Sequence, residues 1–193
     1  MRTRVATFLP CIASLPVALI LAGCAGMTPT ASPTPSTGLS IQGKVHGGQQ
    51  PVVGAHIYLM AANTTGYGNL AVSTLVPTST GTSDSIGGYV LTASDGSFSI
   101  SGDYTCTANT QLYVYSLGGN PGAGTNSAAG FLAALGNCPA DGSLATGTPF
   151  IFVNEVSTVA AAYSMAGFAV DATHVSSSGT ALAESGIAAR SPS

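Results

Sequence analysis

Short alternations of apolar and polar residues, separated by Gly-rich turns, most constrain how this 193-residue chain can fold. From Leu39 to His46, Ile41 and Val45 alternate with polar residues, and the run ends in Gly-Gly-Gln-Gln-Pro. A period of two indicates a strand with one buried face, and repeated runs bounded by Gly and Pro favour an antiparallel β architecture. Further strands are expected at residues 55–60, 89–92, 98–100, 112–117 and 150–153.

Two of these runs carry more detailed expectations. In the second strand we expect Ile57 and Leu59 to face the core. Tyr58 and its neighbour His56 are then expected to face solvent. The sequence Ser-Asp-Gly at 94–96 predicts a β-hairpin between 89–92 and 98–100, because Asp-Gly readily adopts tight hairpin turns.

The sequence of the C-terminal half predicts one or two short helices added to the strands. The first spans Ser127 to Gly136, with a Ser cap and a Gly stop. The second runs from Asn154, as N-cap, to Phe168, with Glu155 in its first turn.

The second helix is apolar nearly all round, so we expect it to bury more than one face, with one left for a partner if the tail does not cover it. Its polar positions Ser157 and Ser164 are expected at the surface. An Asp there should therefore be tolerated, whereas Val159→Asp should cost several kcal/mol. The stripe assigned to the core consists of Val156, Val159, Ala160 and Tyr163.

A spaced motif resembles the carboxypeptidase regulatory-like domain. It consists of Gly43-x-Val45, Pro51-Val52-x-Gly54-Ala55-x-Ile57-x-Leu59 and Thr92-x-x-x-Gly96-x-Phe98-x-Ile100. The resemblance covers residues 41–117, with a longer insertion at 63–88, and implies an Ig-like or prealbumin-like antiparallel β-sandwich related to collagen-adhesin B-type repeats. Such modules serve as stalks, linkers, adhesin repeats and binding accessories, so the resemblance does not specify a function.

A second resemblance extends further along the chain. The strings QGKVHGGQQPVVGA, GDYTC, GGNPGAGTN and NEVSTVAAAY are similar to those of exported proteins from acidobacterial soil bacteria. That group supplies no activity to carry over.

The N-terminus resembles a bacterial lipoprotein signal peptide, residues 1–23, that ends in the lipobox Leu-Ala-Gly-Cys at 21–24. Lipidation is expected at Cys24, and Ala25 after it favours the outer membrane. The alternative is an uncleaved membrane helix, which Pro10 and Pro16 disfavour. Residues 24–38 predict a Pro/Ser/Thr-rich linker, 39–170 the β-sandwich domain, and 171–193 a weakly structured tail.

Cys106 and Cys138 remain once Cys11 leaves with the signal peptide and Cys24 is lipidated. In an oxidising compartment they are expected to form a disulfide, the alternative being two free thiols. The metal interpretation is weak, because no other Cys or His lies at ligand spacing from either cysteine.

The charged residues point away from several function classes. After Cys24 the basic residues are Lys44 and Arg190, against seven acidic residues, which disfavours nucleic acid as a partner. His46, His56 and His174 share no metal-binding spacing, and we expect no cofactor. Two hypotheses stay open: a calcium site between two of Asp84, Asp95, Asp103 and Asp141, and a buried pair of Lys44 with Glu155.

These observations leave three functional hypotheses. The favoured one is a non-catalytic, lipid-anchored envelope module for adhesion, envelope assembly or protein binding. The alternative is a carbohydrate-binding module, although the chain has no Trp. An enzyme is the third and least favoured. The stacking platforms of a carbohydrate-binding module would be Tyr58, Tyr67, Tyr113 or Tyr115.

Overall fold

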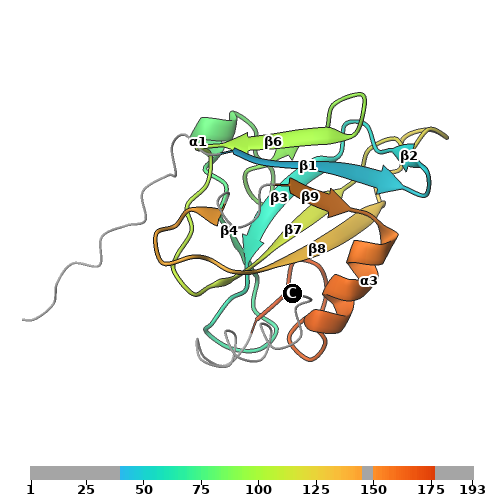
Figure 1. Ribbon diagram of the computed structural model, residues 1–193. Helices are drawn as coiled ribbons and strands as arrows, with labels where there is room; N and C mark the ends of the chain where they lie inside the picture. Colours follow the sequence, from blue (N-terminus) through green and yellow to red (C-terminus); the bar gives the residue numbers. More distant parts are fainter. Residues whose placement is uncertain (1–39, 145–149, 177–193) are drawn as a thin grey trace, which may run out of the picture. The chain divides into compact units, whose positions relative to one another are not determined.

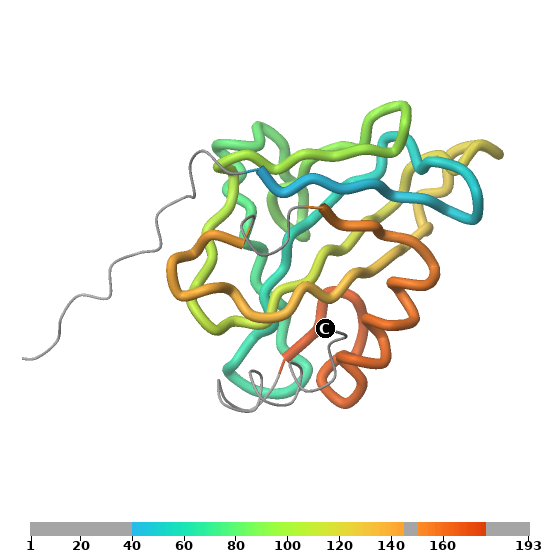
Figure 2. Tube along the Cα trace, in the orientation of Figure 1, coloured from blue at the N-terminus to red at the C-terminus, as the bar shows by residue number. Residues whose placement is uncertain are grey.

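The computed structural model describes residues 40–144 and 150–176, which form two β-sheets packed face to face (Figure 1, Figure 2). The predicted signal peptide, the lipidation site Cys24 and the linker lie outside the described residues, as do residues 177–193 of the predicted tail. In the part of the chain that the structure describes, no helix is long and apolar enough to cross a bilayer.

The first sheet is centred on β1, Ser40–Gly47, whose inward residues Ile41 and Val45 are buried as predicted. One edge of β1 pairs with β6 and with the short β2, both antiparallel. The other edge pairs with β9 in parallel, from Gln42 beside Phe150 to Val45 beside Val153. The partner strands are β2 (Gln50–Pro51), β6 (Ser97–Ser101) and β9 (Phe150–Val153).

The second sheet is built on three long antiparallel strands: β3 (His56–Ala61), β7 (Gln111–Leu117) and β8 (Gly130–Asn137). The short strands β4 (Val72–Ser73) and β5 (Val90–Leu91) pair with β3. Ile57, Leu59 and Val114 point from this sheet into the core beside Phe98 and Ile100. The fold is therefore the predicted mainly β sandwich, with one parallel pair and an added C-terminal helix.

The predicted hairpin at 89–100 is wrong in one respect. The Asp-Gly turn is present, with Gly96 at φ 74° and its carbonyl accepting a hydrogen bond from Val45 N–H at 2.9 Å. However, β5 pairs with β3 while β6 pairs with β1, so the turn carries the chain from one sheet to the other. Turn chemistry predicts a reversal of direction, but it does not select the strand that each arm joins.

The predicted helix at 127–136 is also wrong, because residues 130–137 form strand β8. Phe131, Ala133 and Leu135 pack into the inter-sheet core, while Leu132 and Ala134 pack on the opposite face of the sheet. A strand that is buried on both faces shows no alternation, so its sequence looks like that of a short buried helix. Pairing with β7 decides in favour of the strand.

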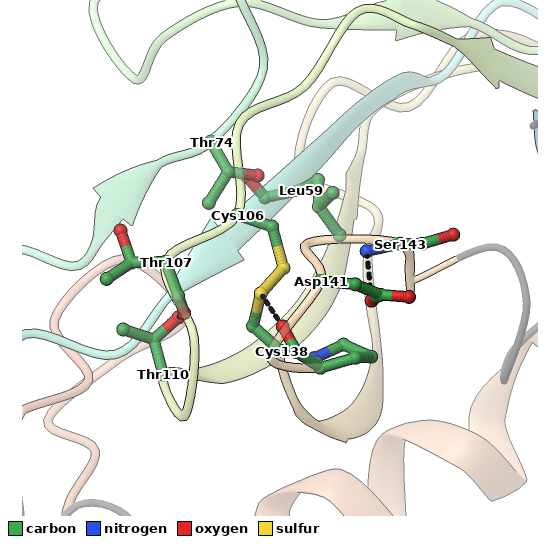
Figure 3. Close-up of a disulfide and its surroundings, with 9 residues drawn as sticks. Leu59, Thr74, Cys106, Thr107, Thr110, Cys138, Asp141 and Ser143 are labelled. Carbon is green, nitrogen blue, oxygen red and sulfur yellow. Dashed lines mark hydrogen bonds between the residues drawn. A yellow bond between two sulfur atoms is a disulfide. The ribbon is translucent and has the colours of Figure 1, made fainter. Parts of the chain in front are cut away.

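The predicted disulfide between Cys106 and Cys138 is confirmed (Figure 3). It joins the segment before β7 to the residue after β8, with 5.9 Å between the two Cα atoms. Backbone hydrogen bonds from Asn109 N–H to Cys138 O and from Cys138 N–H to Thr110 O reinforce the same junction. The bond thus fastens together one end of the β7–β8 pair.

The predicted second helix is confirmed as α3, Glu155–Ser164, with Asn154 as its N-cap, but it ends at Ser164 rather than at Phe168. The Asn154 side chain accepts a hydrogen bond from Ser157 N–H at 3.0 Å, and Ser157 Oγ accepts one from Asn154 N–H at 2.8 Å. This reciprocal capping box satisfies backbone groups at both positions. A second helix, the four-residue α1 (Pro77–Thr80), lies far from α3 (Figure 1).

The orientation predicted for α3 is wrong. Ser164 and Ala161 are fully buried, whereas Val156 and Val159 face outward. The cause lies in the edge of β8, where Leu132 C=O accepts a hydrogen bond from Ser157 Oγ and Leu132 N–H donates one to Thr158 Oγ1. These two hydroxyls satisfy the backbone N–H and C=O of Leu132 as a neighbouring strand would. The polar side of the helix therefore faces inward.

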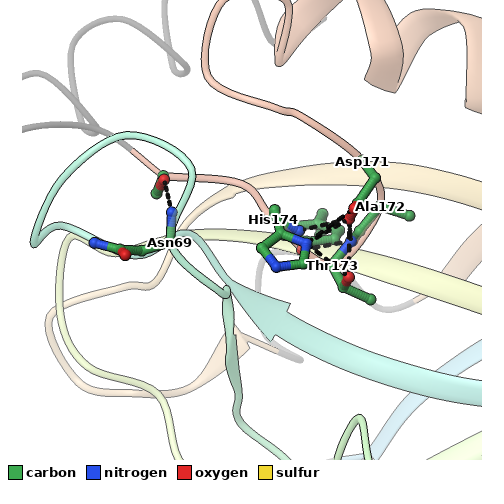
Figure 4. A network of polar contacts seen from close by, with 7 residues as sticks. Asn69, Asp171, Ala172, Thr173 and His174 are labelled. Carbon is green, nitrogen blue, oxygen red and sulfur yellow. Dashed lines mark hydrogen bonds and ion pairs between the residues drawn. The ribbon is translucent and has the colours of Figure 1, made fainter.

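A second core covers the outer face of the β3–β7–β8 sheet. Tyr58 was predicted to face solvent, but it is fully buried there beside Met60 and Tyr113. The C-terminal end of α3 and residues 165–176 form its cover. Tyr113 donates a hydrogen bond to Ala172 O, and Ser176 Oγ accepts one from Asn69 N–H (Figure 4).

The inverted helix face leads to a test by substitution. Ser164→Asp places a carboxylate in an apolar, closed site and is expected to lower the free energy of unfolding by about 3 kcal/mol or more. Val159→Asp changes an exposed position and is expected to shift it by about 0.5 kcal/mol or less. Urea titration of dilute purified protein measures both. A large loss from Val159→Asp with a silent Ser164→Asp would restore the original assignment.

Candidate binding surface

An apolar surface covers the outer sides of α3 and β9, and we call it the α3–β9 face. Its helix residues Val156, Val159 and Tyr163 are 76%, 71% and 73% exposed. Its strand residues Phe150 and Phe152 are 46% and 60% exposed. Contiguous exposed apolar side chains of this kind mark surfaces that bind protein or lipid.

The two phenylalanines reach the surface through the period of the strand. Ile151 and Val153 point into the core, so Phe150 and Phe152 point outward, with ring centroids 5.1 Å apart. They lie beside Gln42 and Lys44 on the neighbouring strand β1. The sequence analysis predicted this strand but overlooked its outer face, although a strand apolar at four consecutive positions already indicates burial or contact on both sides.

A groove of about 250 Å³ lies beside the face, where α3 crosses β8 and β9. Its walls are residues 133–135 of β8, residues 150–152 of β9, and Ser157, Ala160 and Ala161 of α3. Ala160 borders both the groove and the exposed side of the helix. The small side chain therefore joins the groove and the helix face into one continuous surface.

The charged groups near this face are already bound elsewhere. Glu155, at the start of α3, accepts a hydrogen bond from Gly48 N–H at 2.5 Å through Oε1. Lys44 forms an ion pair with Asp95 at 3.0 Å, so the hypothesis of a Lys44–Glu155 pair is wrong. The five side chains that define the face are all uncharged.

A polar cluster lies at the N-terminal end of β3, which begins at His56. Tyr58 donates a hydrogen bond to Asp84 Oδ2 at 2.5 Å, and His56 Nδ1 lies 3.3 Å from the same oxygen. The His56 ring also stacks on Tyr89 at 3.8 Å between centroids. Burial raises the pKa of Tyr58 well above its usual value, and the hydrogen bond to Asp84 adds to this rise.

Asp84 holds this cluster through both of its oxygens. Burial by itself raises the pKa of Asp84, but hydrogen bonds from Tyr58 and from the backbone N–H groups of Ile86 and Gly87 outweigh it and lower the pKa. Oδ1 accepts the two backbone bonds, while Oδ2 accepts the phenol. These contacts give the carboxylate a structural role in anchoring the 84–87 turn to β3.

The remaining acidic candidates accept hydrogen bonds within their own turns, and Asp95 also pairs with Lys44. Asp95 and Asp141 each accept a hydrogen bond from the backbone N–H two residues ahead. Asp103 accepts one from Ser101 N–H, and His174 Nδ1 lies 2.9 Å from Asp171 (Figure 4). Over residues 40–144 and 150–176, the structure brings together no group of three metal-ligating side chains.

The tyrosines proposed as sugar platforms are mostly inaccessible. Tyr58 and Tyr113 are buried, and Tyr115 is half-buried against Tyr58 with 5.9 Å between ring centroids. Tyr67 is the accessible one of the four, at 60% exposed. A separate cleft of about 260 Å³ is lined by threonines and other small residues, and no tyrosine lines it.

Comparison with known proteins adds little to this picture. No protein-family model and no curated protein matches the sequence. A solved structure with partial similarity is the dioxygenase domain of a dioxygenase carbohydrate-binding protein fusion from the cellulolytic bacterium Streptomyces sp. SirexAA-E, at 21% identity and a TM-score of 0.22. The match covers 51% of this chain and 57% of that chain, and at this TM-score it supports no inference about function.

The Asp84 cluster predicts a pH-dependent stability. Because the folded pKa of Asp84 is lowered, its contribution is complete above its unfolded pKa of about 3.9 and is lost as the pH falls through the folded value. Asp84→Asn is expected to cost about 1 kcal/mol at pH 7, since the carboxylate is partly exposed, and less near pH 2. Urea titrations at both pH values measure the difference, and His56→Gln supplies a matched background without the imidazole. An equal cost at both pH values would contradict the assignment.

Proposed function

We propose that this chain is a non-catalytic, lipid-anchored module of the bacterial cell envelope that binds another protein through the α3–β9 face. The observation that carries the proposal is the exposure of five large apolar side chains on one continuous surface. Leaving Val156, Val159 and Tyr163 in water has no benefit for folding, whereas covering them in a complex removes apolar area from water.

The composition of the face favours protein over sugar. Protein interfaces are enriched in aromatic residues and depleted in charge at their centres, as this surface is. Sugar-binding sites add hydrogen-bonding groups around an aromatic platform, and the α3–β9 face offers few such groups. Carbohydrate binding remains the alternative, with Tyr67 as its accessible platform.

The proposed location rests on the N-terminal sequence and on the disulfide. The lipobox at 21–24 supports lipidation of Cys24, and Ala25 supports the outer membrane as the destination. The Cys106–Cys138 bond fits an oxidising compartment outside the cytoplasm. A linker of 24–38 would then hold the domain within about 45 Å of the membrane surface, at about 3.1 Å per residue.

Lipid attachment is tested by replacing the acceptor thiol. Cys24→Ala is expected to abolish incorporation of labelled palmitate and to leave the precursor uncleaved or release the protein from the membrane fraction, because the thiol carries the first acyl group. Cell fractionation with palmitate labelling measures both. Ser79→Ala, on exposed α1, is the matched control. Undiminished labelling of the alanine variant would contradict the proposal.

Protein binding is tested in the native envelope by photo-crosslinking. A benzophenone amino acid at Val156 is expected to give a discrete protein adduct, because this side chain lies on the proposed interface. The same group at Ser79 is the control, since α1 lies far from α3 (Figure 1). Absence of a protein adduct at Val156 beyond that at Ser79 would overturn the proposed function.

A further inference from the structure

We propose that the partner of the α3–β9 face is a second copy of this chain, with α3 packed antiparallel against α3 across a two-fold axis. This inference rests on the proposed protein-binding function and names its partner. It is carried by the spacing of the exposed residues, by the distribution of charge and by the area available.

The spacing of the face suits another helix of the same kind. Val156, Val159 and Tyr163 follow each other at intervals of three and four residues, which is the spacing of the seam in paired helices. Ala160 lies in the middle of this seam and is small, which lets a second helix approach closely. Since the seam centres between Val159 and Ala160, an antiparallel copy presents the same residues in reverse order.

The charge distribution permits a like-with-like contact. The seam carries no charge, and the nearest carboxylate, Glu155, is bound to Gly48 N–H at one end of the helix. In an antiparallel pair the two Glu155 side chains lie at opposite ends, separated by about 15 Å along a ten-residue helix. Repulsion between the two copies is therefore small.

The polar groups beneath the seam are already satisfied within one copy. Ser157 Oγ donates to Leu132 O, and Thr158 Oγ1 donates to Asn154 O and accepts from Leu132 N–H. Covering the helix therefore leaves neither hydroxyl without a partner. Desolvation of unpaired polar groups, a common cost of association, is thus avoided at this point.

The area available indicates a weak dimer. The five exposed side chains offer roughly 500–600 Å² per copy, given about 150–250 Å² for a large side chain, against about 800 Å² per partner in a standard interface. Phe150 and Phe152 flank the helix and supply much of this area. Confinement of both copies to one membrane, through the proposed lipid anchor, would raise their effective concentration and favour the pair.

The test uses the full chain in its own envelope. Val159→Cys is expected to form a covalent dimer on a non-reducing gel or with a short bismaleimide, because Val159 lies next to the two-fold axis. Ser79→Cys, on exposed α1, is the matched control and is expected to remain monomeric. Adding Tyr163→Asp to the Val159→Cys chain is expected to lower the dimer fraction at least about tenfold, because it places a charge on the apolar seam.

The direction of packing has its own readout. In a mixture of two differently tagged chains, Val156→Cys is expected to crosslink to Tyr163→Cys of the other copy more strongly than to another Val156→Cys. A Val159→Cys dimer no stronger than the Ser79→Cys control would overturn the second-copy inference. If Val159→Cys instead joins a different protein, the second-copy inference fails while the proposed protein-binding function stands. If no protein adduct forms at Val156 or Val159, both fail.

Discussion

Burial of the β3–β7–β8 sheet on both faces is the constraint on which the rest of this structure depends. One face carries Ile57, Leu59 and Val114 into the inter-sheet core, and the other carries Tyr58, Met60 and Tyr113 into a second core. A sheet with large side chains on both faces must be covered twice. The first sheet covers one side, and the chain after β9 must return to cover the other.

The need to cover this outer face of the sheet explains the position of α3. The helix closes the open edge of β8 with the hydroxyls of Ser157 and Thr158, and it contributes Ala161 to the second core, where its C-cap residue Met165 is also buried. Residues 169–176 then continue across the sheet, with Val175 fully buried. Because the hydroxyl side of the helix is needed at the strand edge, its valines are left outside.

The apolar α3–β9 face is thus a consequence of how the edge of the sandwich is closed. A sandwich edge exposes backbone groups that can pair with other chains, and proteins commonly cover such edges. Here α3 covers the edge. Its hydroxyls bond the backbone of Leu132, but its outer side exposes Val156, Val159 and Tyr163. The binding activity that we propose therefore lies on the helix that covers the sandwich edge. Lys44, His56 and His174 instead contact nearby aspartates and hold turns and strands together.

Sequence alone determined the features whose causes are local. The alternation in β1, the Asp-Gly turn at 95–96, the Asn154 cap and the pairing of Cys106 with Cys138 each follow from a few neighbouring residues or from composition. The mainly β sandwich follows from several such runs.

Tertiary structure alone decided that residues 130–137 form a strand, that the Asp-Gly turn joins two sheets, and that α3 turns its serines inward. In each case the deciding partner, such as β7 for β8 or Leu132 for Ser157, lies far away in the chain, and no local pattern records a hydrogen bond to a distant backbone.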